Sequence, residues 1–523
     1  MQKSDYKSIL HYLALQSGHS GLSFEDFLLY FTNKNIGKLD LAISETILRD
    51  AFHKRLGSFY NSNIITCIFE FKMIVKRNLS IEKCEAPNVF IGNYSYLLNL
   101  GMFDFVMDNE EAEHLFSQLL EHSPQLTKIC FKFMTVKGLS LIAHHCGPTL
   151  RTINTEIDDN SLDAIQCICR ACPNLRDLSL RCIGAEPNGD DLILTAVQHC
   201  PLIEVLPCLR TVTDIAMNVL ATIHTLKQLS MPSYDCTSSA IQHVLRVNPN
   251  LADIFLLSRD DTLVNCIGRY CGNLKRLTIG REFPPALSNG SLIEVFRGCP
   301  LLEYFDLHQR CGVMSNVALR AMFEFCPHLT EFELFSGELT EQPSPDGESV
   351  IYKSYPSLMK LWLLCGGVST SAFRDIFTHC TNLRLVHLDS CDQFTDETIR
   401  VLARNCTYLN TLHVMSCKNV TMVGLLEVAS NCTSLTELLL YRMPIYDEVL
   451  VQLSLHCPDL TNLSLMSGMD GPITEAGLLA VLERCTGLTF LLISRDMLES
   501  FLPTLDLTKL RQLYPHVQFK ISP

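Results

Sequence analysis

Two segments rich in cysteine and histidine are the first candidates for chemistry in this sequence. Cys167, Cys169 and Cys172 lie close together, and His144-His145-Cys146 forms a second group. Thiolates and imidazoles at short spacing can bind zinc, but a structural zinc site needs four such ligands. Neither segment is followed by a second Cys/His pair at zinc-site spacing. We therefore expect no metal site, and we expect the two histidines to lie at the end of a helix.

Sequence motifs for catalysis are absent as well. The chain has no Walker loop, no dinucleotide-binding glycine fingerprint, no Gly-x-Ser-x-Gly elbow and no His-Glu-x-x-His. A nucleophilic cysteine would need a partner base and electropositive surroundings, and nothing marks out one of the cysteines in this way. The sequence therefore predicts a binding protein that is not an enzyme and has no cofactor.

The composition limits the class of partner and the compartment. Among 523 residues, 42 Lys+Arg against 56 Asp+Glu give a net charge of −14, which argues against nucleic acid because binding phosphates needs clustered cations. We find no apolar stretch long enough to span a membrane and no signal-peptide pattern at the start. We expect a cytoplasmic or nuclear protein whose 24 cysteines are reduced thiols.

The cysteines also disclose an internal repeat. Segments starting at Cys172, Cys326 and Cys457 share the template C-P-x-L-x-x-L-x-L, with Phe332 at one leucine position. The first leucine position of this template recurs about every 26 residues, which is the period of a solenoid protein. The matching residues are Leu126, Leu150, Leu175, Ile203, Leu226, Leu251, Leu274, Leu302, Leu329, Leu358, Leu383, Leu409, Leu435, Leu460 and Leu488.

Each repeat contains a short strand followed by a helix. The L-x-x-L-x-L segment ends in period-two alternation, which predicts a strand with one buried face. In residues 395–406, Ile399, Leu402 and Cys406 lie at helical spacing, and Asp396 stands near the expected N-cap. Neither element can bury its apolar face alone, so stacked copies must share a core. We predict an α/β leucine-rich-repeat solenoid over residues 116–523, with about 15–16 repeats, parallel strands on the concave side and helices on the convex side.

The repeats resemble the cysteine-containing subtype of leucine-rich repeat, in which one cysteine ends the helix and a second follows the strand. The helix-end position holds Cys172, Cys200, Cys271, Cys299, Cys326, Cys380, Cys406, Cys432, Cys457 and Cys485. The position after the strand holds Cys182, Cys311, Cys365, Cys391 and Cys417. This subtype is typical of F-box/LRR proteins, the substrate receptors of cullin–RING (SCF-type) ubiquitin ligases. The resemblance implies a subunit that selects proteins for ubiquitin-dependent degradation and acts as a monomer within a complex.

The N-terminal part lacks the repeat, and we divide it into a helical region, residues 1–60, and an irregular transition, residues 61–115. Five apolar residues are spaced as in a degenerate F-box, which implies contact with a Skp-type adaptor and, through it, with a cullin: Leu22, Phe27, Phe31, Ile36 and Leu39. The usual Leu-Pro opening is Leu22-Ser23 here, and the expected Trp is missing, since the only Trp is Trp362. The alternative is a helical cap on the first repeat, in a leucine-rich-repeat scaffold with no link to ubiquitin.

The concave face of the C-terminal repeats carries the candidate binding site. Residues that alternate with the buried leucines should face this side, and many of them are large: Tyr304, Phe335, Trp362, Leu385, His387, His413, Leu439, Tyr441 and Phe490. Exposed aromatic residues often mark protein interfaces, so we expect a protein substrate here. The alternatives are that the C-terminal tail or a loop covers these residues, or that their exposure has no function.

Two further segments need a separate interpretation: one lacks the expected helix, and the other is the C-terminal tail. Residues 341–348 contain two prolines and a glycine in place of a convex helix, which predicts a protruding acidic loop. Such a loop extends the binding face or is a tolerated insertion. The tail from Tyr514 to Ile521 repeats the strand pattern, and we expect it to form the last edge strand.

Overall fold

The structure is a computed structural model. It contains two compact units, Met1–Pro207 and Cys208–Pro523, and each unit is described by itself. The structure describes Asn99–Leu100, Ser117 and Leu120, and then residues 127–157, 162–182, 188–207, 211–231, 235–257, 260–281, 287–309, 314–336, 349–364, 368–466, 473–502 and 505–522. The five F-box-like positions lie outside the described residues, as does almost all of residues 1–115.

The first unit holds a parallel four-stranded sheet in the order β1-β2-β3-β4. Its strands are Asn99–Leu100, Lys128–Met134, Thr152–Ile157 and Asp177–Cys182, and its helices are α7 Val136–Cys146, α8 Leu162–Ala171 and α9 Gly189–His199. The repeat anchored at Ile203 lacks the strand that we expected. Val205 forms only an isolated bridge with Asp177, because Pro207 has no N–H with which to extend the ladder.

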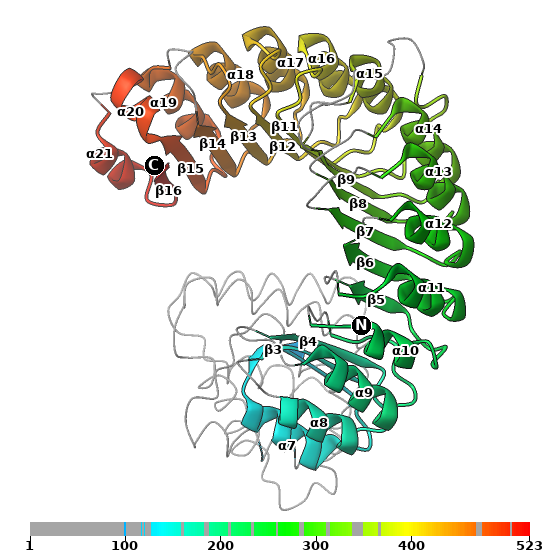
Figure 1. Cartoon of the computed structure of the whole chain (residues 1–523). Helices are drawn as coiled ribbons and strands as arrows, with labels where there is room; N and C mark the ends of the chain where they lie inside the picture. The colour runs from blue at the N-terminus through cyan, green and yellow to red at the C-terminus, as the bar shows by residue number, and fades with distance from the viewer. Residues whose placement is uncertain are drawn as a thin grey trace, which may run out of the picture. The chain divides into compact units, whose positions relative to one another are not determined.

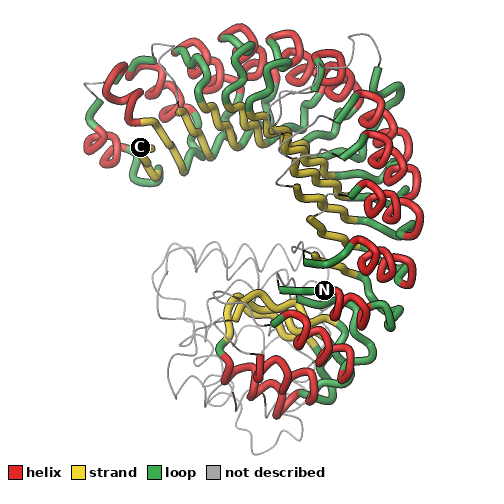
Figure 2. The backbone as a smooth tube through the Cα atoms, in the orientation of Figure 1, coloured by secondary structure: helices red, strands yellow, loops and turns green. Residues whose placement is uncertain are grey.

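The second unit holds a parallel sheet of twelve strands, ordered β5 to β16 in sequence (Figures 1 and 2). These strands are β5 Gln228–Met231, β6 Asp253–Leu257, β7 Arg276–Arg281, β8 Tyr304–Gln309, β9 Glu331–Ser336, β10 Lys360–Leu364, β11 Leu385–Asp389, β12 Thr411–Met415, β13 Glu437–Tyr441, β14 Asn462–Met466, β15 Phe490–Ser494 and β16 Gln518–Ser522. The tail strand β16 pairs with β15, as the sequence predicts.

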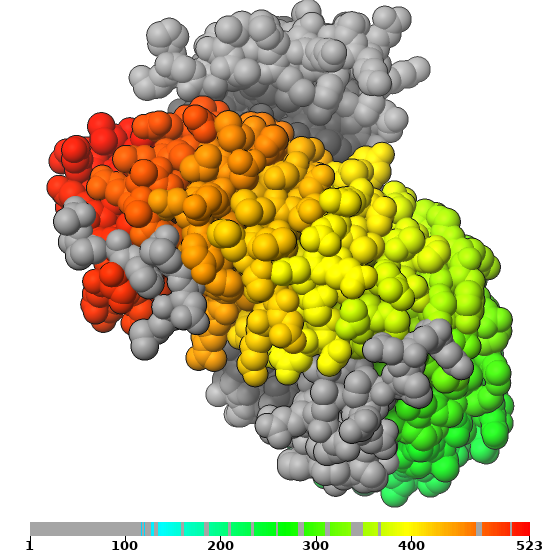
Figure 3. Space-filling model, turned by 90° about the horizontal axis from the view of Figure 1, so that it is seen from above, coloured from blue at the N-terminus to red at the C-terminus, as the bar shows by residue number. Residues whose placement is uncertain are grey.

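Helices cover the outer side of this sheet, and the strands line its inner, concave side (Figure 1). The helices are α10 Asp214–Leu220, α11 Ser238–Val247, α12 Asp261–Tyr270, α13 Asn289–Gly298, α14 Asn316–Phe325, α15 Thr370–His379, α16 Asp396–Asn405, α17 Met422–Asn431, α18 Asp447–His456, α19 Glu475–Arg484, α20 Arg495–Phe501 and α21 Leu507–Leu513. In Figure 3 the repeats from α15 to α19 follow one another as adjacent bands from yellow to red.

The core lies between the two layers and follows the leucine pattern. In β12, Leu412 and Val414 are buried, and in α16 Ile399 and Leu402 are buried. The same alternation recurs along the sheet, so each repeat buries its apolar faces on the next. The fold is a leucine-rich-repeat solenoid, as the period of the sequence predicts.

The helix starts differ in one detail from the expected capping. Thr395, not Asp396, is the N-cap of α16, and it forms a capping box with Thr398. Asp396 instead accepts three hydrogen bonds from the next repeat: from the backbone N–H of Thr421 at 2.8 Å, from its hydroxyl at 2.6 Å and from the backbone N–H of Gly424 at 3.1 Å. Asp447 likewise accepts from the N–H and the hydroxyl of Thr474. The aspartate therefore links consecutive helix starts.

The helix-end cysteines are buried free thiols with a specific contact. Cys406 caps α16, and its Sγ donates to the carbonyl oxygen of Cys380 at 3.6 Å. Cys457 and Cys432 repeat this contact at 3.4 Å. The thiol thus adds a second donor to a carbonyl at the end of the neighbouring helix, which already accepts from the backbone N–H three residues later, as Cys432 does from Leu435 at 3.2 Å. Burial raises the pKa of the Cys406 thiol to about 12, which keeps it protonated and unreactive.

The structure describes the two segments rich in cysteine and histidine, but it does not describe the proline-containing segment 341–348. Cys167 is exposed on α8 while Cys169 is buried, and His144 and His145 end α7. Within the described ranges, no group of three His, Cys, Asp or Glu side chains could hold a metal ion, and no helix is long and apolar enough to cross a membrane. Residues 341–348 lie outside the description, and residues 349–359, directly before β10, contain no helix.

Candidate functional site

The candidate site lies on the concave face of strands β8 to β13. In each strand the second and fourth residues are buried toward the helices, and the first, third and fifth alternate with them. The strands pair in register, so third residues align in one row that runs from Asp306 through Glu333 and Trp362 to His387 and His413. Parallel strands lie about 4.8 Å apart, so side chains of one row contact one another.

All nine predicted concave residues occupy positions in strands of this sheet that alternate with the core, eight of them in β8 to β13 and Phe490 in β15. The structure brings Phe335 (β9), Trp362 (β10), His387 (β11) and His413 (β12) close together, and Tyr304 lies apart at the start of β8, beside Asp306. Four others lie outside this group: Leu385, Leu439, Tyr441 and Phe490. Tyr441 contacts Arg442, whose guanidinium carbon lies 5.2 Å from the ring centre. Lys520 covers the ring of Phe490 at 5.4 Å.

Four rings contact one another in turn across the middle strands, and we call this group the ring stack. His308 stacks on Phe335 with ring centres 4.1 Å apart and planes 9° from parallel. Phe335 and Trp362 are not stacked but tilted, with ring centres 6.2 Å apart and planes at 39°, and Trp362 stacks on His387 at 4.2 Å. Phe335 and Trp362 keep part of their surface open to solvent. Stacked and tilted ring contacts of this kind stabilise a rigid aromatic surface.

A pair of histidines continues the stack. The Nδ1 atoms of His387 and His413 are 3.1 Å apart, and only one of them can carry the hydrogen of that bond. On its other side, His413 donates from Nε2 to the carboxylate of Glu437 at 2.9 Å. The Glu437 carboxylate therefore fixes the orientation of His413, which in turn orients His387 beneath Trp362.

His387 is more buried than the sequence predicts. Its position alternates with the core, yet only 8% of it is exposed, because Trp362 and His413 cover it. This burial, together with the neighbouring His413, lowers the pKa of His387 to about 4. His387 is therefore a neutral support for the indole ring at pH 7 and is not itself an exposed contact residue.

Two carboxylates lie beside the stack. Asp306 and Glu333 are direct register partners on β8 and β9, and Asp306 is only 5% exposed. The hydroxyl of Tyr304 lies 3.4 Å from Oδ2 of Asp306. Burial, and after it the charge of Asp306, raises the pKa of Glu333. Burial and these two carboxylates raise the pKa of the Tyr304 hydroxyl, so it stays a proton donor.

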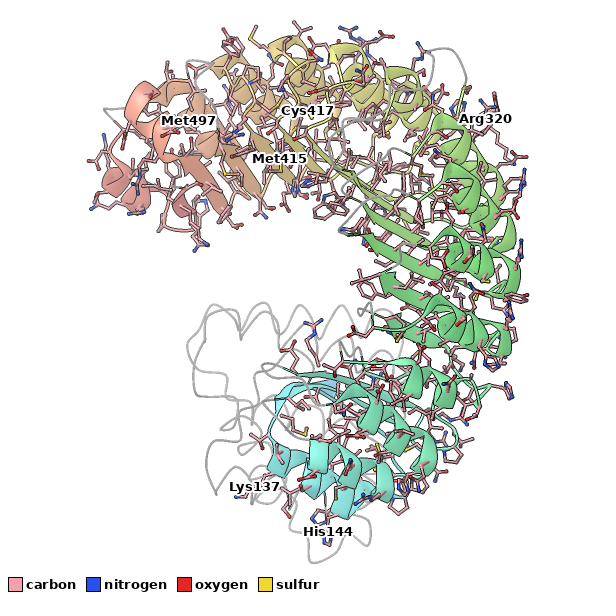
Figure 4. The ribbon with its side chains drawn as sticks, viewed as in Figure 1. Lys137, His144, Arg320, Met415, Cys417 and Met497 are labelled. Atoms are coloured by element: carbon pink, nitrogen blue, oxygen red, sulfur yellow. The ribbon has the colours of Figure 1, made fainter. Side chains whose placement is uncertain are left out.

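Alternation with the leucines also puts Asp306, Glu333 and His308 on the concave side, but the predicted site left them out because it selected large apolar and aromatic side chains. In the structure all three occupy the same alternating positions as the predicted residues. Met415, labelled in Figure 4, also lies on this face at the end of β12, while Cys417, two residues later, is fully buried. Among the described residues of the site, no three His, Cys, Asp or Glu side chains are arranged to hold a metal ion.

Comparisons with known proteins give likenesses in structure only. No family model matches the chain, and no curated protein matches it. One similar solved structure is the yeast Rad7 and Elc1 complex, with 14% identity over 88% of this chain and 98% of that chain and a TM-score of 0.41.

Two further likenesses come from other organisms. The Toll–Spatzle complex of Drosophila shows 13% identity over 75% of this chain and 49% of that chain, with a TM-score of 0.38. An internalin of Listeria monocytogenes shows 13% identity over 77% of this chain and 94% of that chain, with a TM-score of 0.36. Identities and TM-scores are low throughout, and we infer nothing about function from these likenesses.

Proposed function

We propose that the chain is a protein-binding receptor without an active site of its own, and that it holds its partner on the concave face of β8 to β13. The observation that carries this proposal is the half-exposed ring stack centred on Phe335 and Trp362. Rigid aromatic surfaces of this kind provide most of the binding energy in protein interfaces. The ring positions are fixed by strand pairing and by His387, so binding costs little side-chain entropy.

The finer proposal is that this receptor is the substrate-recognition subunit of an SCF-type ubiquitin ligase in the cytoplasm or nucleus. Its support is the cysteine-containing repeat pattern and the F-box-like spacing of Leu22, Phe27, Phe31, Ile36 and Leu39. The repeats would hold the substrate, a Skp-type adaptor would bind the N-terminal region, and a cullin would bring the enzymes that transfer ubiquitin.

A scaffold without a ubiquitin link is the second candidate. Two observations in the sequence favour it: Ser23 stands where the F-box usually has proline, and the only tryptophan, Trp362, lies in the solenoid. In that case the N-terminal region caps the repeats, and the concave site keeps its role in binding a protein.

One capture experiment with the full-length chain tests both parts. We expect the wild type to bind a purified Skp-type adaptor and to retain a defined set of cellular proteins identified by mass spectrometry. Phe27→Asp with Phe31→Asp should abolish adaptor binding and leave that set unchanged. Trp362→Ala should lose that set of proteins and still bind the adaptor. Tyr408→Ala is the matched control, because Tyr408 is an exposed aromatic residue in a turn.

Each part of the proposal has its own contradicting result. If the wild type fails to bind the adaptor, the ligase assignment is wrong and the scaffold is left. If Trp362→Ala retains the same proteins as Tyr408→Ala, the concave face is not the binding site. Thermal unfolding of both variants provides the control for folding: Trp362 is half-buried, so its loss should lower the melting temperature only modestly, and a large loss would show that Trp362 belongs to the core.

A further inference from the structure

Among the described residues, no lysine or arginine pairs with the acidic side of the ring stack. Lys360 pairs with Glu331 at 2.9 Å, and Arg276 lies 3.7 Å from Asp253 and covers the Tyr304 ring at 4.2 Å. No described lysine or arginine forms an ion pair with Asp306 or Glu333. Two carboxylates thus stand side by side in one row with no positive charge of their own.

One of these carboxylates is also short of hydrogen bonds. Asp306 is 95% buried, and its Oδ1 accepts no hydrogen bond from a described residue. The Nε2 atom of His308 lies 2.9 Å from this oxygen, but the two atoms are not aligned as a hydrogen bond requires, so we count the contact as electrostatic only. A buried carboxylate oxygen without a donor costs free energy, and a donor from a bound partner would remove that cost.

Next to the carboxylates lie flat aromatic surfaces. Trp362 is the register partner of Glu333, and Phe335 lies two residues after Glu333 in β9. A guanidinium group is planar, is weakly hydrated, stacks on aromatic rings and donates two parallel hydrogen bonds to a carboxylate. An ammonium group can use the negative charge but cannot use the planar geometry.

We propose that the Asp306–Glu333–Trp362 row binds an arginine side chain of the protein partner. The guanidinium group donates to the carboxylate of Glu333 and, by displacing His308, to Oδ1 of Asp306, and it stacks on the neighbouring rings. This inference rests on the proposed function, since it specifies what the concave face recognises. This row would select partners that present an arginine on an exposed segment narrow enough to reach the concave face of the sheet.

The only tryptophan of the chain lies in this row, so its fluorescence reports the site directly. The full-length protein is titrated with a capped glycine-rich pentapeptide that carries one central arginine, and in parallel with the same peptide carrying citrulline or lysine. A single side chain should bind with a dissociation constant of about 1 mM. We expect a saturable change with arginine, at least about tenfold weaker binding of citrulline, and weaker binding of lysine.

Glu333→Gln should weaken binding of the arginine peptide about tenfold, and Glu397→Gln on the outer helix α16 should leave it unchanged. Circular dichroism checks that both variants are folded. Equal binding of arginine and citrulline, no saturable change, or equal affinities of the two variants would each overturn the inference; equal binding of lysine would overturn the choice of arginine. If cellular partners are lost in Trp362→Ala but kept in Glu333→Gln, this inference fails while the proposed function stands.

Discussion

At the scale of single residues, the site depends on a histidine that does not itself face solvent. His387 supports Trp362 by stacking and is held by His413, which is held by Glu437. Protonation of His387 would place a charge in a buried position, next to a second imidazole, where solvation is poor. The pH response of the protein should therefore include a contribution from this residue.

Replacing His387 with glutamine should make the unfolding free energy less dependent on pH in mild acid. The pKa of His387 is about 4 in the folded protein against 6.5 for the free side chain, so the unfolded chain binds the proton more tightly between these values. Its contribution to stability is complete above about pH 6.5 and is lost as the pH falls toward 4. From about pH 7.5 to about pH 5, the wild type should lose about 2 kcal/mol more unfolding free energy than His387→Gln.

Urea unfolding of both proteins at the two pH values measures this difference. His328→Gln is the control, because His328 is an exposed histidine in a turn, and it should follow the wild type. Identical losses for wild type and His387→Gln would show that His387 stays solvated in the folded protein.

The residue scale also shows where sequence reasoning stops. Alternation with the leucines places Trp362, His387 and Phe335 on the correct face. It does not reveal that His387 is covered or that Asp306 is buried, because both facts depend on side chains of neighbouring repeats. Which side chains cover one another depends on the register between strands some 25 to 30 residues apart in the chain. The sequence shows the spacing of these strands but not which residues become register partners.

At the scale of secondary-structure elements, side chains join each repeat to the next. Aspartates at the first helical position bind the N-cap threonine of the following helix, as in Asp214 with Thr237 and Asp396 with Thr421. Helix-end cysteines make the corresponding contact at the other end. Both ends of a helix, where backbone groups lack intrahelical partners, are thus tied to a neighbour.

Loss of one aspartate should loosen the link between two repeats. Asp396→Ala removes the acceptor for the N–H and hydroxyl of Thr421 and for the N–H of Gly424. We expect a loss of about 1–2 kcal/mol in unfolding free energy. Glu397→Ala, the next residue in the same exposed turn, is the matched control and should cost much less. Equal losses in chemical denaturation would show that the charge near the helix start matters, and not the link.

Three strand ends contain a backbone feature that the repeat pattern does not predict. Ser390, Ser416 and Arg442 have φ near 53°, in the left-handed region that side chains other than glycine rarely adopt. Each donates its N–H to the last carbonyl of the next strand, as Ser416 does to Tyr441 at 2.8 Å. The period of the sequence predicts the strands and helices themselves, since those depend on local patterns of apolar residues. The strained turns arise from contacts between repeats.

At the scale of the whole second unit, the twelve-stranded sheet is a one-dimensional stack in which each repeat depends on its neighbours. The last strand, β16, covers the apolar edge of β15 and buries Val517 and Phe519. β16 is itself the edge of the sheet, but its exposed Lys520 discourages pairing with other molecules, whereas the apolar strand β15 would invite it if it formed the edge. The small terminal strand therefore matters for the solubility of the unit.

A charge placed in this terminal contact should open the edge of the sheet. Phe519→Asp buries a carboxylate without a partner, which destabilises the strand by several kcal/mol, so β16 should detach from β15. We expect an earlier thermal transition and an increase in light scattering on warming, while the other repeats stay folded because each contacts only its neighbours. Gln518→Asp adds the same charge one residue earlier, on an exposed side chain, and should behave as the wild type. If both variants melt and scatter alike, β16 does not protect this edge, and the stack owes its solubility to its charged outer helices.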